Sequence, residues 1–188
     1  MKEGKIILIT CGHLEREITS SITEDILRVL HYPVNFKICN LDLSSFYNPG
    51  RRQYDANMIL KKVTENAPEG FVRIIGLLKV DLYIPILTYI FGQATLGGRA
   101  AIASLYRLRN EGYGLKPDNQ LLIERFGKVV IHELGHTFGL IHCQNPVCIM
   151  RSSTYVEDLD QKQNEFCYIC REVLNQKRES QSNKFSNL

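Results

Sequence analysis

Three histidines and one glutamate lie close together in the C-terminal third of the chain. With one glycine they form the pattern H-E-x-x-H-x-x-G-x-x-H, made by His132, Glu133, His136, Gly139 and His142. Histidines four residues apart lie on the same face of a helix, so both imidazoles can reach a single metal ion. The pattern therefore predicts a zinc site whose first two ligands are His132 and His136.

The glycine of this pattern is expected to end the helix. Glycine adopts left-handed backbone conformations at little steric cost, so the chain can turn at Gly139 and bring His142 to the same ion. Three protein ligands leave the fourth zinc position open, which is typical of catalytic rather than structural zinc. Zinc lowers the pKa of its water and polarises a carbonyl, and Glu133 is placed to act as general base. These residues predict a zinc-dependent peptidase.

Four of the six cysteines follow in the last quarter of the chain. Cys143 and Cys148 are spaced C-x4-C, and Cys167 and Cys170 are spaced C-x2-C. Paired cysteines indicate a structural zinc site closed by four ligands, although two disulfides or an iron–sulfur cluster are alternatives. The apolar stretch at residues 6–9 is too short for a signal peptide, so we expect a cytoplasmic protein, in a compartment where disulfides are disfavoured. The sequence thus predicts two Zn²⁺ per chain, one catalytic and one structural.

The full pattern H-E-x-x-H-x-x-G-x-x-H-C-x4-C-x-M, followed by C-x2-C, resembles the archaemetzincins, a branch of the metzincin metallopeptidases. The motif covers residues 132–170. Residues 92–101 are similar to the family's glycine-rich stretch, and the resemblance is weaker over residues 1–90. It implies a mixed α/β zincin-type fold, catalytic zinc on the three histidines with Glu133 as general base, and structural zinc on the four cysteines. It also implies a Met-turn with Met150 beneath the catalytic zinc, which overlaps with its role as an ordinary core methionine.

Length and composition restrict the class of protein. A chain of 188 residues with 44% hydrophobic and 23% charged residues suits one globular domain. The net charge of +3 is too small to indicate nucleic acid or an anionic membrane, and no apolar run approaches the roughly 18 residues that span a bilayer. We expect a monomeric catalytic domain over residues 1–188 that acts on peptide or protein substrates. Its parts would be residues 1–138, with the sheet and active-site helix, and residues 139–188, with the Met-turn and cysteine site.

Hydrophobic periodicity predicts the elements that hold these residues. Strands are expected at residues 5–10, 34–39, 71–82 and 100–105, and helices at residues 15–30, 56–66, about 119–138 and 166–174. The initial order of strand, helix and strand predicts a parallel pair. Loops are expected at residues 42–55 and 106–117 and a frayed tail from residue 176, while residues 83–96 are ambiguous. Asp118 is the expected cap of the helix that carries the motif.

The substrate is expected to lie along residues 97–105, because in metzincins the strand before the active-site helix follows the cleft. An exposed strand edge can bind an extended peptide through main-chain hydrogen bonds. Gly97 and Gly98 would let the substrate backbone approach closely, or they would serve a bend. Tyr155, five residues after Met150, is a further candidate for assisting an oxyanion.

Two other functions compete with the peptidase. One is a catalytically silent two-zinc scaffold or binding protein, which would have no need of Glu133. The other is a nucleic-acid-binding zinc module, which the modest charge and the lack of an aromatic and basic stripe argue against.

Overall fold

The computed structural model describes residues 4–39 and 41–185, with only the backbone at residues 11, 39 and 180–185. The chain forms helices and strands, with short 3-10 helices labelled η. The elements are β1 (Ile6–Cys11), α1 (Arg16–Leu30), β2 (Val34–Cys39), η1 (Ser44–Phe46), β3 (Tyr47–Asn48), β4 (Gln53–Asp55), α2 (Ala56–Glu65), β5 (Arg73–Leu78), β6 (Leu82–Ile84), β7 (Leu87–Ile90), β8 (Gly92–Ala94), β9 (Ala100–Ser104), η2 (Tyr106–Leu108), η3 (Asn110–Tyr113), α3 (Asn119–Thr137), α4 (Val156–Asp160) and α5 (Tyr168–Phe185).

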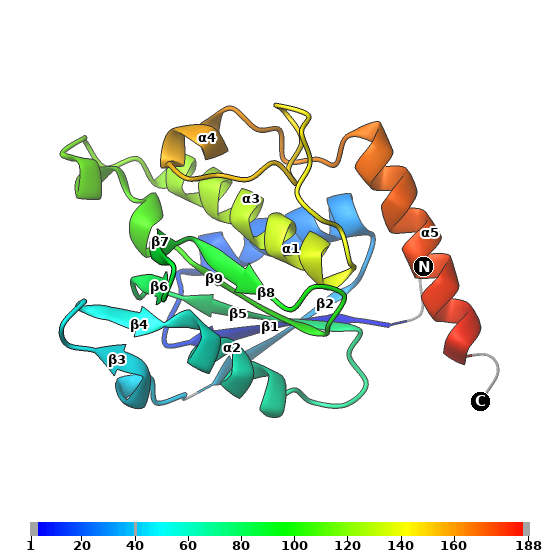
Figure 1. Cartoon of the computed structure of the whole chain (residues 1–188), viewed down its shortest axis with the longest axis horizontal. Coiled ribbons are helices and arrows are strands. Elements are labelled where there is room, and N and C mark those ends of the chain that lie inside the picture. Colours follow the sequence, from blue (N-terminus) through cyan, green and yellow to red (C-terminus); the bar gives the residue numbers. More distant parts are fainter. Residues whose placement is uncertain (1–3, 40, 186–188) are drawn as a thin grey trace.

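A five-stranded sheet with the order β2-β1-β5-β9-β8 forms the centre of the molecule (Figure 1). β1 pairs in parallel with β2 and β5, with Ile6 opposite Val34, and β5 pairs in parallel with β9. Only β8 is antiparallel to its neighbour in this sheet. A smaller sheet with the order β3-β4-β6-β7 lies beside it, at the left of Figure 1. The expected mixed α/β fold and the parallel first pair are confirmed.

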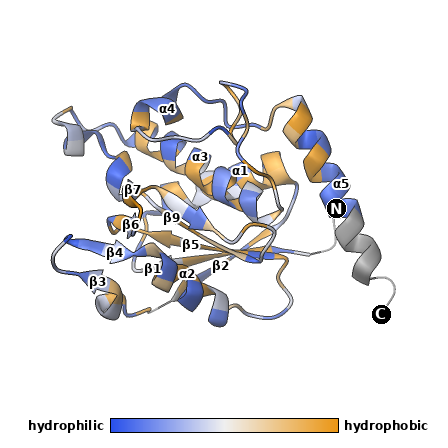
Figure 2. Ribbon diagram, viewed as in Figure 1, coloured by the Kyte–Doolittle hydropathy of each residue, from blue (hydrophilic) through white to orange (hydrophobic). Residues whose placement is uncertain are grey.

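Helices cover both faces of the large sheet. α1 and α3 pack together on one face, and α2 packs on the other (Figure 1). Successive side chains of a strand point to opposite faces, so Leu8 belongs to the core under α1 and α3 while Ile7 and Ile9 belong to the core under α2. Figure 2 shows apolar residues along the strands of this sheet and on the sides of α1 and α3 that face it.

The motif helix α3 is largely buried, and a cap at its start and packing along its length fix its position. At its start the Asp118 carboxylate accepts a hydrogen bond from the Leu121 backbone N–H at 2.9 Å, so the expected cap is confirmed. Side chains along its length pack against α1 and β9. The helix ends at Thr137, one residue before the predicted end.

Three predicted segments differ from the structure, and they all contribute to the small sheet. The strand expected at residues 71–82 ends at Leu78, and the chain continues into β6 in the second sheet. Asp81, between these strands, is buried and receives two hydrogen bonds from Arg107, at 2.7 and 2.5 Å. The rest of the small sheet is drawn from the expected loop at residues 42–55 and the ambiguous residues 83–96.

The chain after β9 contains more helix than predicted. α4 was not expected, the loop predicted at residues 106–117 contains η2 and η3, and α5 continues to Phe185 through the tail expected to fray. Arg178 explains the longer helix, because its guanidinium lies over the rings of Tyr32 and Phe138 and donates to the Leu30 carbonyl at 3.1 Å. None of the described helices combines the length and apolar character needed to cross a bilayer.

Candidate active site

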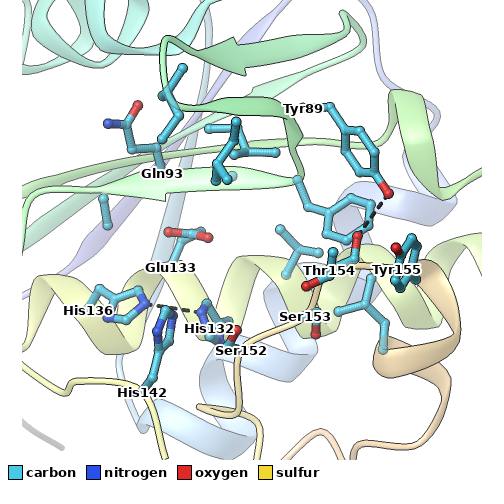
Figure 3. Close-up of a pocket in the computed structure, with 18 of the residues that line it drawn as sticks. Tyr89, Gln93, His132, Glu133, His136, His142, Ser152, Ser153, Thr154 and Tyr155 are labelled. Atoms are coloured by element: carbon cyan, nitrogen blue, oxygen red, sulfur yellow. Dashed lines mark hydrogen bonds between the residues drawn. The ribbon is translucent and has the colours of Figure 1, made fainter.

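Three imidazoles meet beside the C-terminal half of α3. His132 and His136 come from successive turns of the helix, and His142 comes from the loop after it. The chain turns at Gly139, whose φ of +90° is left-handed as the sequence predicts. One ring nitrogen of each histidine lies within 4.8 Å of the others, and Figure 3 shows the rings directed toward one another.

Backbone carbonyls fix which nitrogen of two histidines faces the cluster. His132 Nδ1 lies 2.8 Å from the Ile149 oxygen, and His136 Nδ1 lies 2.7 Å from the Leu140 oxygen. A carbonyl only accepts, so each Nδ1 carries the proton and each Nε2 presents a lone pair. These two Nε2 atoms are 3.1 Å apart. Neutral imidazoles whose lone pairs converge are the donor set that zinc takes, so the residues fit a zinc ion.

Burial keeps these imidazoles neutral. It lowers the pKa of His132 well below its usual value, and it lowers the pKa of His136 and of His142 in the same direction. Since only the neutral ring can bind a metal through Nε2, the environment favours the metal-binding form.

Glu133 lies next to the histidine cluster and is buried (Figure 3). Burial raises the pKa of this carboxyl group to about 8, while the nearby Lys162 charge acts to lower it. Gly92 of β8 leaves the space that Glu133 occupies. A Cβ atom at Gly92 would lie 2.7 Å from Glu133 Cγ and 2.9 Å from Oε1. The sequence analysis did not identify Gly92 as a positioning residue, because residues 83–96 were ambiguous; a glycine within a strand often marks a close approach.

Met150 lies directly beneath α3. Its side chain is fully buried, and a Cβ atom at Gly135 would lie 2.5 Å from the Met150 sulfur. The Met150 carbonyl accepts a hydrogen bond from the Cys143 N–H at 2.9 Å, so this turn is tied to the residue after His142. Gly135 was missed by the sequence analysis, although a glycine inside a helix is a recognisable sign of close packing.

The four clustered cysteines form a second group. The sulfur atoms of Cys143, Cys148, Cys167 and Cys170 all lie within 4.8 Å of one another. All four are free thiols, and the sulfur atoms of Cys143 and Cys167 are 3.8 Å apart, so the two-disulfide alternative does not describe this structure. Four converging sulfurs are the donor set of a closed structural zinc site.

A cavity of about 790 Å³ opens beside Glu133 and the histidines. Its lining is mostly apolar and includes Leu87, Ile90, Phe91, Val129, Ile141 and Leu159. On the side away from His136 the Tyr89 hydroxyl donates to the Thr154 carbonyl at 2.8 Å and so links β7 to the chain after Met150 (Figure 3). Tyr155 also lines the cavity, but its side chain is largely exposed.

Known proteins are similar to this chain in sequence and in fold. Residues 30–176 match the model of Peptidase family M54. The chain belongs to this family. The archaemetzincin of Thermococcus kodakarensis is 42% identical over 131 residues, or 69% of this chain and 70% of the relative. The archaemetzincin of Saccharolobus solfataricus is 37% identical over 173 residues, or 90% and 92% of the two chains.

Solved structures of similar proteins agree with the fold. The archaemetzincin from Methanopyrus kandleri matches with a TM-score of 0.83 and 33% identity, covering 94% of this chain and 96% of that one. A zinc-dependent peptidase from Methanocorpusculum labreanum matches with a TM-score of 0.76 and 32% identity, covering 90% and 99%. The predicted resemblance and fold class are therefore confirmed.

The prediction for the strand edge of this M54 member was wrong. β9, which contains most of residues 97–105, pairs with β5 on one side and β8 on the other, so its edges are occupied. The edge strand on this side of the sheet is β8, which lines the cavity. Gly97 and Gly98 lie in the turn between β8 and β9, outside the cavity lining. The Gly97 N–H donates to the His136 carbonyl at 2.9 Å, so the glycines serve a bend against the end of α3.

Proposed function

We propose that this chain is a zinc-dependent peptidase that hydrolyses peptide bonds of peptide or protein substrates. The observation that carries the proposal is the convergence of three neutral imidazoles, with Glu133 beside them, on one wall of an apolar cavity. Membership of a peptidase family and the similarity to a zinc-dependent peptidase support it. The scaffold alternative is less well supported, since Gly92 leaves space for a carboxylate that a scaffold does not need.

His132, His136 and His142 would hold the catalytic zinc through their ring nitrogens. When bound there, zinc lowers the pKa of a water molecule and polarises the carbonyl of the substrate. The protein holds two of these ligands in place by the hydrogen bonds from their Nδ1 atoms to backbone carbonyls.

Glu133 would act as general base. Its carboxylate takes a proton from the attacking water and later gives that proton to the leaving amine. A positive ion at the histidines favours the ionised form of this buried group, which burial alone disfavours. The carboxylate lies on the cavity side of α3 and is confined by Gly92.

A second, structural zinc would be held by Cys143, Cys148, Cys167 and Cys170. Closure by four thiolates leaves no position for a substrate. Cys143 follows His142 directly, so this zinc would also hold the third histidine in place. Free thiols suit a reducing compartment, and we propose that the protein works in the cytoplasm as a monomer without nucleic-acid or membrane partners.

The substrate would lie as an extended segment along the outer edge of β8. Main-chain hydrogen bonds to this edge give affinity without sequence preference. The apolar lining would bind an apolar side chain next to the cleaved bond.

Peptide digestion tests the proposed function. The zinc-loaded protein is incubated with a diverse peptide mixture, and the products are identified by mass spectrometry. We expect cuts beside apolar residues that disappear after removal of zinc and return when zinc is restored. Protein shown to hold zinc at the histidines that makes no cuts would contradict the proposal. The cut positions separate internal cleavage from removal of N-terminal residues.

Gly92→Ala should slow cleavage without removing zinc. The added methyl group would lie 2.7 Å from both Glu133 Cγ and the Ile102 carbonyl oxygen, so the carboxylate must shift. We expect kcat to fall at least tenfold, because displacement of a catalytic group by about 1 Å costs up to 10²-fold. Gly112→Ala is the matched control, since a methyl group there meets no atom within 4 Å. Equal kcat values for the two variants would show that Gly92 does not position Glu133.

Tyr89→Phe should widen the range of side chains that the cavity accepts. The variant keeps the ring but loses the hydrogen bond to the Thr154 carbonyl, so that wall of the cavity can move. We expect kcat/KM for peptides with bulky aromatic residues to rise severalfold relative to leucine peptides, which matches a loss of about 1 kcal/mol. Tyr113→Phe is the control, because its hydroxyl also donates to a backbone carbonyl, of Arg107, but lies outside the cavity lining. If the ratio of kcat/KM for aromatic peptides to kcat/KM for leucine peptides is unchanged in Tyr89→Phe, Tyr89 does not determine which side chains the cavity accepts.

A further inference from the structure

Lys162 is a buried lysine in the wall of the cavity that also contains Glu133. It follows α4, and only 3% of its surface is exposed. Burying a primary amine is unfavourable unless hydrogen bonds or charges compensate for its loss of water.

The contacts of Lys162 lead to the turn that carries Met150. Its Nζ donates to the Ile149 carbonyl at 3.4 Å and, more closely, to the Arg151 carbonyl. The Ile149 oxygen is also the acceptor for His132 Nδ1, at 2.8 Å. One ammonium group therefore holds the backbone on both sides of Met150 and shares an acceptor with a proposed zinc ligand.

The charge of Lys162 reaches the whole histidine cluster. Lys162 lines the same cavity as Glu133 and the three histidines. Besides burial, which is the main cause of their pKa shifts, its charge acts to lower the pKa of each of these four groups. Burial lowers the pKa of Lys162 itself to about 8, while Asp158, Cys148 and Glu133 raise it. Within residues 4–39 and 41–185, no carboxylate lies within salt-bridge distance of its Nζ. Its charge therefore acts on the site rather than being cancelled by a direct partner.

We propose that Lys162 supplies fixed positive charge beside the scissile bond, where the Ile149 and Arg151 carbonyls hold its ammonium group. The proposal rests on the proposed function. Negative charge develops on the substrate carbonyl oxygen during attack, and a fixed cation in a dry cavity stabilises it. The same cation repels a zinc ion at the histidines.

The charge of Lys162 thus favours catalysis but disfavours zinc binding, so its removal should change kcat and zinc affinity in opposite directions. Lys162→Met removes the charge and leaves the Ile149 carbonyl to His132 alone. We expect the variant to bind zinc at the histidines about tenfold more tightly, because a like charge has gone. We expect its kcat to fall by about 10- to 100-fold with little change in KM, because the lost interaction favours developing charge rather than bound substrate. A purely structural lysine would instead weaken zinc binding and activity together.

The experiment compares Lys162→Met, Lys162→Arg and a control, Lys128→Met. Lys128 also donates to a backbone carbonyl near α4, that of Leu159 at 3.0 Å, but lies outside the cavity lining. Zinc affinity is measured by chelator competition, histidine geometry by the absorption spectrum of the Co²⁺ form, and kcat and KM on a peptide that the wild type cleaves. Lys162→Arg keeps the charge, so its zinc affinity and kcat should be close to those of the wild type. Lys128→Met should match the wild type in both.

Weaker zinc binding in Lys162→Met, or unchanged zinc affinity and unchanged kcat, would overturn the proposal. If Lys162→Met does not fold, Lys162→Gln removes the charge while keeping a donor for the two carbonyls, and the same criteria apply. If the wild type cleaves no peptide, the proposed function fails, yet the zinc affinities still decide whether the charge of Lys162 acts on the histidine site, and the Co²⁺ spectra show whether its geometry is unchanged.

Discussion

Glu133→Ala should lower kcat/KM for peptide cleavage by about 10³-fold, because general base catalysis contributes roughly 10²–10⁴-fold. Among the cavity residues Glu133 is the only carboxylate, so no neighbour can replace it as the proton acceptor. Zinc content should not change, since the three imidazoles that would hold the ion remain. Glu133→Gln, which keeps the shape of the side chain, should lose nearly as much activity. Steady-state kinetics on one peptide, with metal analysis of each variant, measures both quantities.

The control for this experiment is Glu124→Gln on the same helix. Glu124 is exposed and accepts a hydrogen bond from Gln120 at 3.0 Å, about two helical turns before His132. Wild-type kinetics are expected for it. Cleavage by Glu133→Ala at the wild-type rate would rule out the general base, and loss of zinc from the variant would show that Glu133 holds the metal site together.

Local spacing predicted most of the proposed metal ligands, because helix geometry fixes which residues share a face. His132 and His136 needed only a regular helix, and Gly139 needed only a left-handed turn to bring in His142. Asp118 was equally predictable as a cap. Each of these features is decided by residues within one or two turns of chain.

The order of strands was not predictable in the same way. A strand's neighbours are set by the whole sheet, so residues 97–105 gave no sign that β8 would pair with β9 and become the edge strand. Asp81 ended the expected long strand through a partner 26 residues away, Arg107. Lys162 was missed for the same reason, since its contacts with Ile149 and Arg151 depend on how the chain after Met150 folds back.

Cys148→Ser should affect both proposed zinc sites and the stability of the whole chain. The cysteine is buried, and its neighbour Ile149 provides the carbonyl that orients His132. Loss of one thiolate opens the four-sulfur site, and structural zinc contributes about 10–16 kcal/mol of apparent binding free energy in small domains. Even if only about 5 kcal/mol of unfolding free energy is lost here, Tm should fall by roughly 10–20 °C. Metal analysis should show less zinc at the histidines as well, although no ligand of that ion was changed.

His136→Gln tests whether loss of the histidine site affects the sulfur site in turn. It removes a proposed ligand of the catalytic zinc but leaves the four sulfurs and their connection to α5 intact, so we expect one zinc to be lost with only a small change in Tm. Cys143→Ser should resemble Cys148→Ser, because Cys143 follows His142 and donates its N–H to the Met150 carbonyl. Full zinc at the histidines in both cysteine variants would show that the two sites are independent. If the cysteine variants lose zinc from both sites while His136→Gln loses it only from the histidines, then zinc binding at the histidines depends on the sulfur site.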